Sequence, residues 1–194
     1  MTDDLTRREF VKLGVAGAAG LAIAPNVAGA ALPLPGRPLG RTGHVAGLFS
    51  LGGQASIEQA DKHDVSIAII NRAIDLGVNY IDTAAAYGRP RDATRQRCEL
   101  DGISQTFVGE VMATRRKEVF LASKTDDRTR DGSLRLLEQS LKLLKTDHLD
   151  LWQLHNIARD EQLDQIFGKD GAIEALIEAR DQKMVRFLGI TGHF

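Results

Sequence analysis

Apolar positions along the chain alternate between helical stripes and short strand-like runs. In residues 64–76, apolar side chains recur three and four positions apart, which predicts an amphipathic helix that ends at Gly77. The β-branched and aromatic run at 78–81 then predicts a buried strand. The same rhythm predicts further elements, in order helix 104–115, strand 118–123, helix 131–144, strand 148–154, helix 171–182 and strand 184–190. Each crossover must return the chain to the same direction, so this alternation implies a parallel sheet.

The segment before the first helix starts with a proline-rich linker, residues 31–36. Turn-like glycines in residues 37–47 predict a short hairpin, and residues 48–51 predict the first buried strand of the sheet. Gly52 and Gly53 end that strand. Two adjacent glycines let a backbone approach a flat, bulky group without a Cβ in the way, and a plain turn needs them equally often.

Residues 1–30 differ in character from everything that follows. A polar start leads into the pair Arg7-Arg8, which precedes a polar, an aromatic and an aliphatic residue and Lys12, and then into the small apolar run 13–24. Ala28-Gly29-Ala30 supplies small residues at the two positions that a signal peptidase reads. This pattern predicts a twin-arginine-type signal peptide, export to the periplasm, and the twin-arginine export machinery as a partner. The alternative is an N-terminal amphipathic helix of the domain.

The composition predicts one soluble globular domain after the leader. The chain has 194 residues, of which 43% are hydrophobic and 26% charged. A formal net charge of -1, with no long basic run, argues against a nucleic-acid partner, because phosphate binding needs clustered Lys and Arg. Cys98 is the only cysteine, so the chain can form neither an intrachain disulfide nor a thiolate metal site. We interpret it as a free thiol in a loop.

Reactive side chains follow three successive predicted strands: Asp82, Lys124 and His155, with Tyr87 shortly after Asp82. An open doubly wound sheet fits the number of strands, but a closed barrel gathers such strand ends around one axis. A full barrel has eight units and about 250 residues. The 164 residues after the leader (194 - 30) hold five units, so we expect the first part of an α/β fold, a (β/α)8 TIM barrel. We expect this chain alone neither to fold stably nor to catalyse.

Five motifs with predicted helices between them carry a family resemblance. Residues 37–194 resemble the aldo-keto reductases in Arg37-Pro-Leu-Gly-Arg-Thr-Gly, Asp75-Leu-Gly-Val-Asn-Tyr-Ile-Asp-Thr-Ala with Tyr87-Gly88, Leu121-Ala-Ser-Lys, Leu149-Asp-Leu-Trp-Gln-Leu-His and Lys183-Met-Val-Arg-Phe-Leu-Gly. The resemblance implies an oxidoreductase that reduces the carbonyl of a small-molecule aldehyde or ketone to an alcohol. It also implies a nicotinamide cofactor, NADP(H) in preference to NAD(H). Oligomeric state and substrate identity are not implied.

The resemblance assigns a catalytic role to each of four residues. Hydride delivered to a carbonyl leaves negative charge on its oxygen, which a proton or strong hydrogen bonds must meet. Tyr87 is the expected proton donor, and Lys124 the cation that stabilises its anion, because a free phenol has a pKa of about 10. Asp82 would hold the ammonium, and His155 would orient the substrate oxygen. Individually, each residue also has a structural interpretation as a cap, a rim aromatic, a surface charge or a satisfied histidine.

The chain departs from the family pattern in two places. At the fifth strand the family commonly has Gly-x-Ser-Asn at the nicotinamide carboxamide. Here Thr191 keeps the hydroxyl and Gly192 offers only backbone, while His193 is a possible substitute. We expect cofactor contacts from Gly52, Gly53, Thr191 and Gly192. The loop 89–102 is longer than in many members and holds four arginines. Two interpretations are open: a solvated lid, or a segment that attracts an anionic substrate or a cofactor phosphate. Trp152 is expected to pack against a helix.

Two other functions fit parts of the pattern. The first is a non-enzymatic, reductase-like subunit that binds the cofactor or senses redox state. The second is a barrel hydrolase with a metal on Asp82, His155 and His193. We expect no metal, because the remaining histidines are not grouped with carboxylates at ligand spacing, namely His44, His63 and His148.

Overall fold

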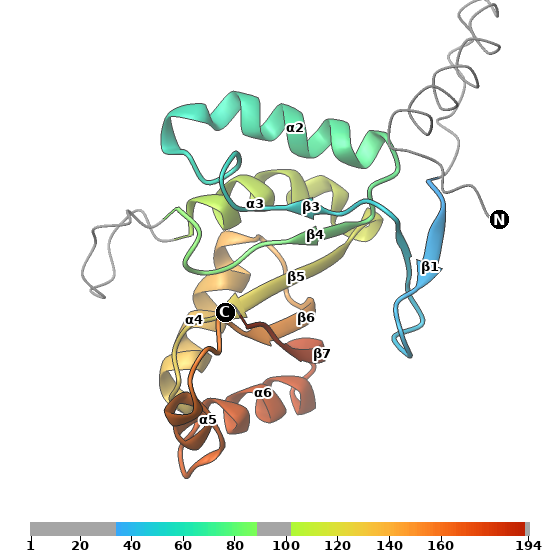
Figure 1. Ribbon diagram of the computed structural model, residues 1–194. Helices are drawn as coiled ribbons and strands as arrows, with labels where there is room; N and C mark the ends of the chain where they lie inside the picture. The colour runs from blue at the N-terminus through green and yellow to red at the C-terminus, as the bar shows by residue number, and fades with distance from the viewer. Residues whose placement is uncertain (1–33, 89–101, 193–194) are drawn as a thin grey trace, which may run out of the picture. The chain divides into compact units, whose positions relative to one another are not determined.

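A five-stranded parallel sheet forms the centre of the computed structural model, which describes residues 34–88 and 102–192 (Figure 1). Its strands lie in chain order: β3 (Leu51–Gly52), β4 (Tyr80–Asp82), β5 (Phe120–Thr125), β6 (Leu149–Leu154) and β7 (Val185–Ile190). An antiparallel hairpin precedes it, of β1 (Gly36–Pro38) and β2 (Val45–Gly47). The predicted hairpin and parallel sheet are therefore confirmed. The predicted signal peptide, the arginine-containing loop 89–101 with Cys98, and His193 lie outside the described residues.

Helices connect the strands. They are η1 (Ala60–Lys62), α2 (His63–Asp75), α3 (Ile103–Arg115), η2 (Arg116–Glu118), α4 (Arg130–Leu143), α5 (Asp160–Phe167) and α6 (Ala172–Asp181). Because the strand order never reverses, every crossover runs in the same direction, and right-handed crossovers then place all helices on one face of the sheet. A doubly wound sheet has helices on both faces. The observed order is that of a barrel segment, as predicted.

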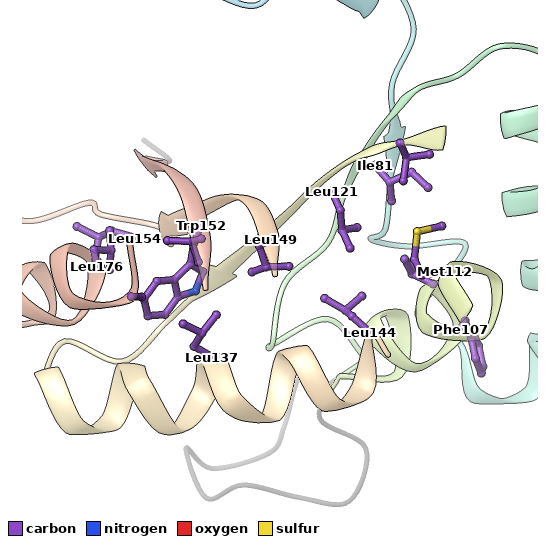
Figure 2. Close-up of a cluster of buried hydrophobic side chains, with 14 of the residues drawn as sticks. Ile81, Phe107, Met112, Leu121, Leu137, Leu144, Leu149, Trp152, Leu154 and Leu176 are labelled. Atoms are coloured by element: carbon purple, nitrogen blue, oxygen red, sulfur yellow. The ribbon is translucent and has the colours of Figure 1, made fainter. Parts of the chain in front are cut away.

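The main core lies between the sheet and these helices. Ile81, Leu121 and Trp152 project from three neighbouring strands towards apolar side chains of α3, α4 and α6 (Figure 2). Trp152 is fully buried next to Leu137 and Leu176, which confirms that it packs against helices. Burial of such large side chains drives folding, at roughly 25 cal/mol per Å² of apolar area.

The opposite face of the sheet carries a ladder of aromatic rings. Tyr80 stacks on Phe120 with ring centroids 5.3 Å apart, and Phe120 stacks on Phe187 at 6.1 Å. Side chains alternate along a strand, so Asp82 and Lys124 lie on this same face, further towards the carboxyl ends of β4 and β5. The sheet register therefore places Asp82 and Lys124 on the same face as the stacked aromatic rings, nearer the carboxyl ends of the strands.

The first predicted strand is wrong in its position. The structure places β3 at Leu51–Gly52 instead of 48–51, and Leu48 and Phe49 are 57% and 67% exposed. The Leu48 N–H still donates to the Pro35 carbonyl oxygen, so this segment continues from the hairpin and joins β4 only at Leu51. The apolar pattern did not distinguish this edge from a buried strand.

Two further differences concern the later elements. β5 extends through Lys124 and Thr125, which pair with Gln153 and Leu154 of β6, so Lys124 lies inside the strand that it was expected to follow. The sequence also did not predict α5, a short helix of eight residues in which only Ile166 is buried. None of the helices in the described ranges is long and apolar enough to span a membrane.

Candidate active site

Lys124 is buried at the centre of a three-membered hydrogen-bond arrangement. Its side chain is 4% exposed, and its Nζ donates to Asp82 Oδ1 at 2.8 Å and to the Thr83 carbonyl oxygen at 2.9 Å. The Asp82 side chain is 35% exposed, so the ion pair opens towards solvent on one side. A buried ammonium needs such partners, because burial without them disfavours its charged form. Parallel pairing of β4 with β5 brings the two residues together.

Tyr87 reaches the same ammonium from the turn after β4. Its phenol oxygen accepts the third hydrogen bond of Lys124 Nζ at 3.2 Å, and the nitrogen lies 4.8 Å from the ring centroid. The turn is closed by a hydrogen bond from the Tyr87 N–H to the Ala84 carbonyl oxygen. Gly88 then adopts a φ of 101°, a left-handed conformation that favours glycine. The local turn therefore folds the tyrosine back over the strand ends.

His155 completes the group from the end of β6. Its ring meets the Tyr87 ring edge-on, with centroids 5.7 Å apart and planes at 80°. Its backbone N–H donates to the Thr125 carbonyl oxygen, and its own carbonyl oxygen accepts from Arg128 at 2.7 Å. All four predicted tetrad residues, Asp82, Tyr87, Lys124 and His155, are thus brought together.

A polar groove of about 730 Å³ begins at His155. Its walls come from the loops after β4, β5 and β6 and from α4 and α5, and include Ala86, Asp127, Arg135 and Gln165. Active sites in barrels of this type are built from these loops at the carboxyl ends of the strands. The groove therefore offers room for a small molecule next to the tetrad.

Tyr80, the other tyrosine of the sequence, lies in a different environment. It is two residues before Asp82 on β4 and stacks on Phe120. Burial, with a smaller contribution from the charge of Asp82, raises the pKa of Tyr80 to about 12. Its phenol is therefore held protonated, and of the two tyrosines Tyr87 is the one hydrogen-bonded to Lys124.

Sequence reasoning gave no role to three polar residues next to the tetrad. Gln153 pairs with Lys124 across β5 and β6, and its Nε2 lies 3.5 Å from Asp82 Oδ1. The Thr83 carbonyl accepts from Lys124, and the Thr83 hydroxyl contacts Ser104 at 2.9 Å. The strand register identifies Gln153, whereas nothing in the sequence pattern places Ser104 there.

The four predicted cofactor-binding residues differ in the space around them. A Cβ added at Gly52 would meet no heavy atom within 4 Å, and Gly52 pairs with Asp82, so a flat group could approach this backbone. A Cβ at Gly53 would overlap Ser104 Oγ, so this glycine is required by internal packing. The Thr191 hydroxyl accepts from the Asn156 N–H at 3.0 Å, and a Cβ at Gly192 would lie 2.9 Å from the Ile157 carbonyl oxygen. The cofactor contacts of these four residues stay predictions.

The hydrolase hypothesis requires a metal site among histidine and carboxylate side chains, of which the structure describes those in residues 34–88 and 102–192. In these ranges no group of three or more His, Cys, Asp or Glu side chains is arranged to hold a metal ion. His63 does contact its neighbour Asp64 and also Glu110, which lies 47 residues further along the chain. The spacing of possible metal ligands in the sequence did not indicate the contact with Glu110. The hydrolase hypothesis requires His193, which lies outside the described residues.

Comparison with known proteins places this site in a family. The model of the aldo/keto reductase family matches residues 45–193, and the chain belongs to that family. It is 31% identical over 138 residues to the uncharacterized oxidoreductase YqkF of Bacillus subtilis (strain 168), covering 65% of this chain and 39% of YqkF. It is 34% identical over 100 residues to the methylglyoxal reductase YeaE of Escherichia coli (strain K12), covering 50% and 31%.

A solved structure of the same family has a similar fold. It is an aldo/keto reductase from Klebsiella pneumoniae in complex with NADP and acetate, with a TM-score of 0.62 and 26% identity, covering 78% of this chain and 48% of that one. The family fold is a (β/α)8 barrel, and the five parallel strands are part of one. The chain spans less than half the length of these three relatives.

Proposed function

We propose that the protein reduces aldehyde or ketone carbonyls to alcohols with a nicotinamide cofactor. The observation that carries the proposal is the geometry of Lys124, whose Nζ donates to Asp82, to the Thr83 carbonyl and to the phenol of Tyr87. An ammonium has three N–H donors, and all three are engaged here. The phenol oxygen accepts one of them, which leaves the phenol O–H to point at a substrate.

Each tetrad residue then has a definite task. Tyr87 donates its proton to the carbonyl oxygen as negative charge grows there, and Lys124 stabilises the phenolate that remains. Asp82 holds the ammonium in place and balances its charge. His155 borders both the Tyr87 ring and the polar groove, so it is placed to hydrogen-bond the substrate oxygen and orient it.

The open backbone at Gly52 fits a flat nicotinamide ring next to Asp82. When bound, the cofactor supplies the hydride for the carbonyl carbon. Thr191 and Gly192 lie after β7, at the same end of the sheet as the tetrad, and would hold the ring's amide. The K. pneumoniae relative with NADP bound supports NADP(H) in preference to NAD(H). Gly53 contributes through packing under this site.

The substrate proposal is a small carbonyl compound. The relative YeaE is named a methylglyoxal reductase, which supports small dicarbonyls as first compounds to assay. The groove beside His155 has mostly polar walls, so it suits a substrate with polar groups near the carbonyl.

Export through the twin-arginine pathway to the periplasm is part of the proposal and rests on residues 1–30 alone. This pathway carries folded proteins, which suits a protein that takes up its cofactor in the cytoplasm. Replacement of Arg7 and Arg8 by lysine should leave the protein in the cytoplasmic fraction of a host with that pathway. Unchanged export of this variant would refute the export proposal.

Tyr87→Phe in the full-length protein tests the proposed chemistry, with Tyr80→Phe as the matched control. Removal of the phenol should lower kcat for NADPH-dependent carbonyl reduction by about 10²–10⁴-fold and leave cofactor affinity unchanged. Tyr80 does not contact Lys124, so its variant should keep activity. Cofactor oxidation at 340 nm and cofactor fluorescence measure the two quantities. Full activity of Tyr87→Phe would refute the assignment, and cofactor binding without any carbonyl reduction in the wild type would favour the cofactor-sensing subunit.

A further inference from the structure

The carbonyl that holds Lys124 belongs to a residue in a buried hydroxyl pair. Lys124 Nζ donates to the Thr83 carbonyl oxygen at 2.9 Å, and Thr83 Oγ1 lies 2.9 Å from Ser104 Oγ. Thr83 and Ser104 are both 0% exposed. Buried hydroxyl groups that satisfy one another fix local geometry, because a lone buried hydroxyl is costly. Ser104 therefore supports the lysine through one intermediate residue.

Ser104 also contacts the backbone of the proposed proton donor. Its N–H donates to the Tyr87 carbonyl oxygen at 3.4 Å. Ser104 is the second residue of α3, and the N–H groups of a first helical turn have no partner inside the helix. One residue thus contacts both Thr83, whose carbonyl orients the ammonium, and Tyr87, whose phenol accepts from it.

Packing leaves this hydroxyl pair little freedom to move. A Cβ added at Gly53 would overlap Ser104 Oγ and lie 3.2 Å from Thr83 Cβ. The Thr83 N–H donates to the Ala122 carbonyl oxygen at 3.0 Å, which ties the residue to β5. β3, β4, β5 and the start of α3 therefore meet at the pair, directly beneath the ammonium.

We propose that Thr83 and Ser104 are positioning residues for the proton transfer, and this inference rests on the proposed function. Two of the three N–H groups of Lys124 are held by Asp82 and the Thr83 carbonyl, so the direction of the third towards Tyr87 depends on where that carbonyl lies. A displacement of about 1 Å in a reacting group can lower a rate by about 100-fold. The hydroxyl pair fixes the position of the Thr83 carbonyl relative to the turn that carries Tyr87.

The test compares Ser104→Ala and Thr83→Val with Thr83→Ser in the full-length protein. The first two remove one hydroxyl each and should lower kcat by about 10- to 100-fold, with KM and cofactor affinity unchanged. A less well placed ammonium stabilises the phenolate less, so the alkaline limb of the pH profile of reduction should move to higher pH. Thr83→Ser keeps the hydroxyl and should restore most of the kcat. The double variant should lose no more than the worse single variant, because both changes break one contact.

Three outcomes overturn the proposal. Wild-type kcat and pH profile in both Ser104→Ala and Thr83→Val would show that the pair positions nothing. A loss of kcat that follows the loss of folded protein, with an unmoved pH profile, would show a structural role only. An inactive wild-type protein overturns the proposed function together with this inference, whereas an active wild type with insensitive variants overturns this inference alone.

Discussion

Asp150 is predicted to stabilise the fold from the end of the strands opposite the tetrad. It is the second residue of β6, and its side chain is 5% exposed. Its carboxylate accepts from Arg116 at 2.8 Å, from Arg186 at 2.6 Å and from the Leu121 N–H at 2.9 Å. The contact with Arg116 joins β6 to the turn before β5, and the contact with Arg186 joins it to β7. Replacement by asparagine keeps the shape and removes the charge.

The free-energy cost of Asp150→Asn depends on how deeply each contact of Asp150 is buried. Breaking a buried ion pair by removal of one partner costs about 3–5 kcal/mol. The Arg186 side chain is 52% exposed, so solvent screens its share to about 0–1 kcal/mol. Arg116 is 16% exposed and carries most of the effect. An asparagine oxygen can still accept one N–H, so Asp150→Asn should cost about 3 kcal/mol of unfolding free energy and lower Tm.

Thermal and urea unfolding followed by circular dichroism measure this cost. The control is Asp181→Asn, because Asp181 is 64% exposed and contacts its neighbour Arg180 on the surface. That variant should change the free energy of unfolding by less than about 0.5 kcal/mol. Equal shifts for the two variants would refute the reasoning, since burial would then decide nothing.

Acid pH gives a second check on Asp150. Burial by itself would raise the pKa of Asp150, but the Leu121 N–H and the two guanidinium groups outweigh burial and lower the pKa below its ordinary value of 3.8. A lowered folded pKa gives stability that is present above 3.8 and is lost as pH falls through the folded pKa. The Tm difference between wild type and Asp150→Asn should therefore shrink below about pH 3.8.

Two more predictions concern the helices. Hydrogen bonds to Asp64 and Glu110 raise the pKa of His63 above 6.5, so its stabilising effect is present below 6.5 and is lost as pH rises through the folded pKa. The Tm advantage of wild type over His63→Gln should fall as pH rises above 6.5; a flat difference contradicts this. Gly109→Ala should lower the free energy of unfolding in urea by about 1–3 kcal/mol despite better helix propensity, because a Cβ would overlap the Leu143 carbonyl oxygen. Higher stability would refute the close packing of α3.

The helices could be predicted from the sequence because their apolar stripes are regular. The predicted helix 64–76 is α2, His63–Asp75, and Gly77 ends it with a φ of 90° as expected from its position. The prediction fails for α5, because its eight residues give only about two turns of the pattern and bury only Ile166. The strand at 48–51 was wrong for the opposite reason, since apolar Leu48 and Phe49 are exposed. Composition alone does not show which neighbour a segment will have.

The tetrad could be predicted because parallel strands bring their carboxyl ends to one edge. Asp82 ends β4, Lys124 is the last but one residue of β5 and His155 follows β6, so parallel pairing in chain order brings them to one edge. Ser104 could not be found this way, because it depends on where α3 begins and on the space left by Gly53. Residues that support a site through backbone carbonyls leave no pattern in the sequence.

The ion pair of Asp150 with Arg116 and that of Asp82 with Lys124 have different roles. We assign the first to stability and the second to catalysis. The Asp150 side chain is 5% exposed and accepts from three donors, whereas the Asp82 side chain is 35% exposed. Barrels of this type place stability at the amino ends of the strands and catalysis at the carboxyl ends. Asp150→Asn should therefore lower Tm without moving the pH profile. Ser104→Ala should move the pH profile, in addition to the Tm cost of the Thr83 hydroxyl that it leaves alone. Because the two sites share no partner, the effects of the combined variant should add.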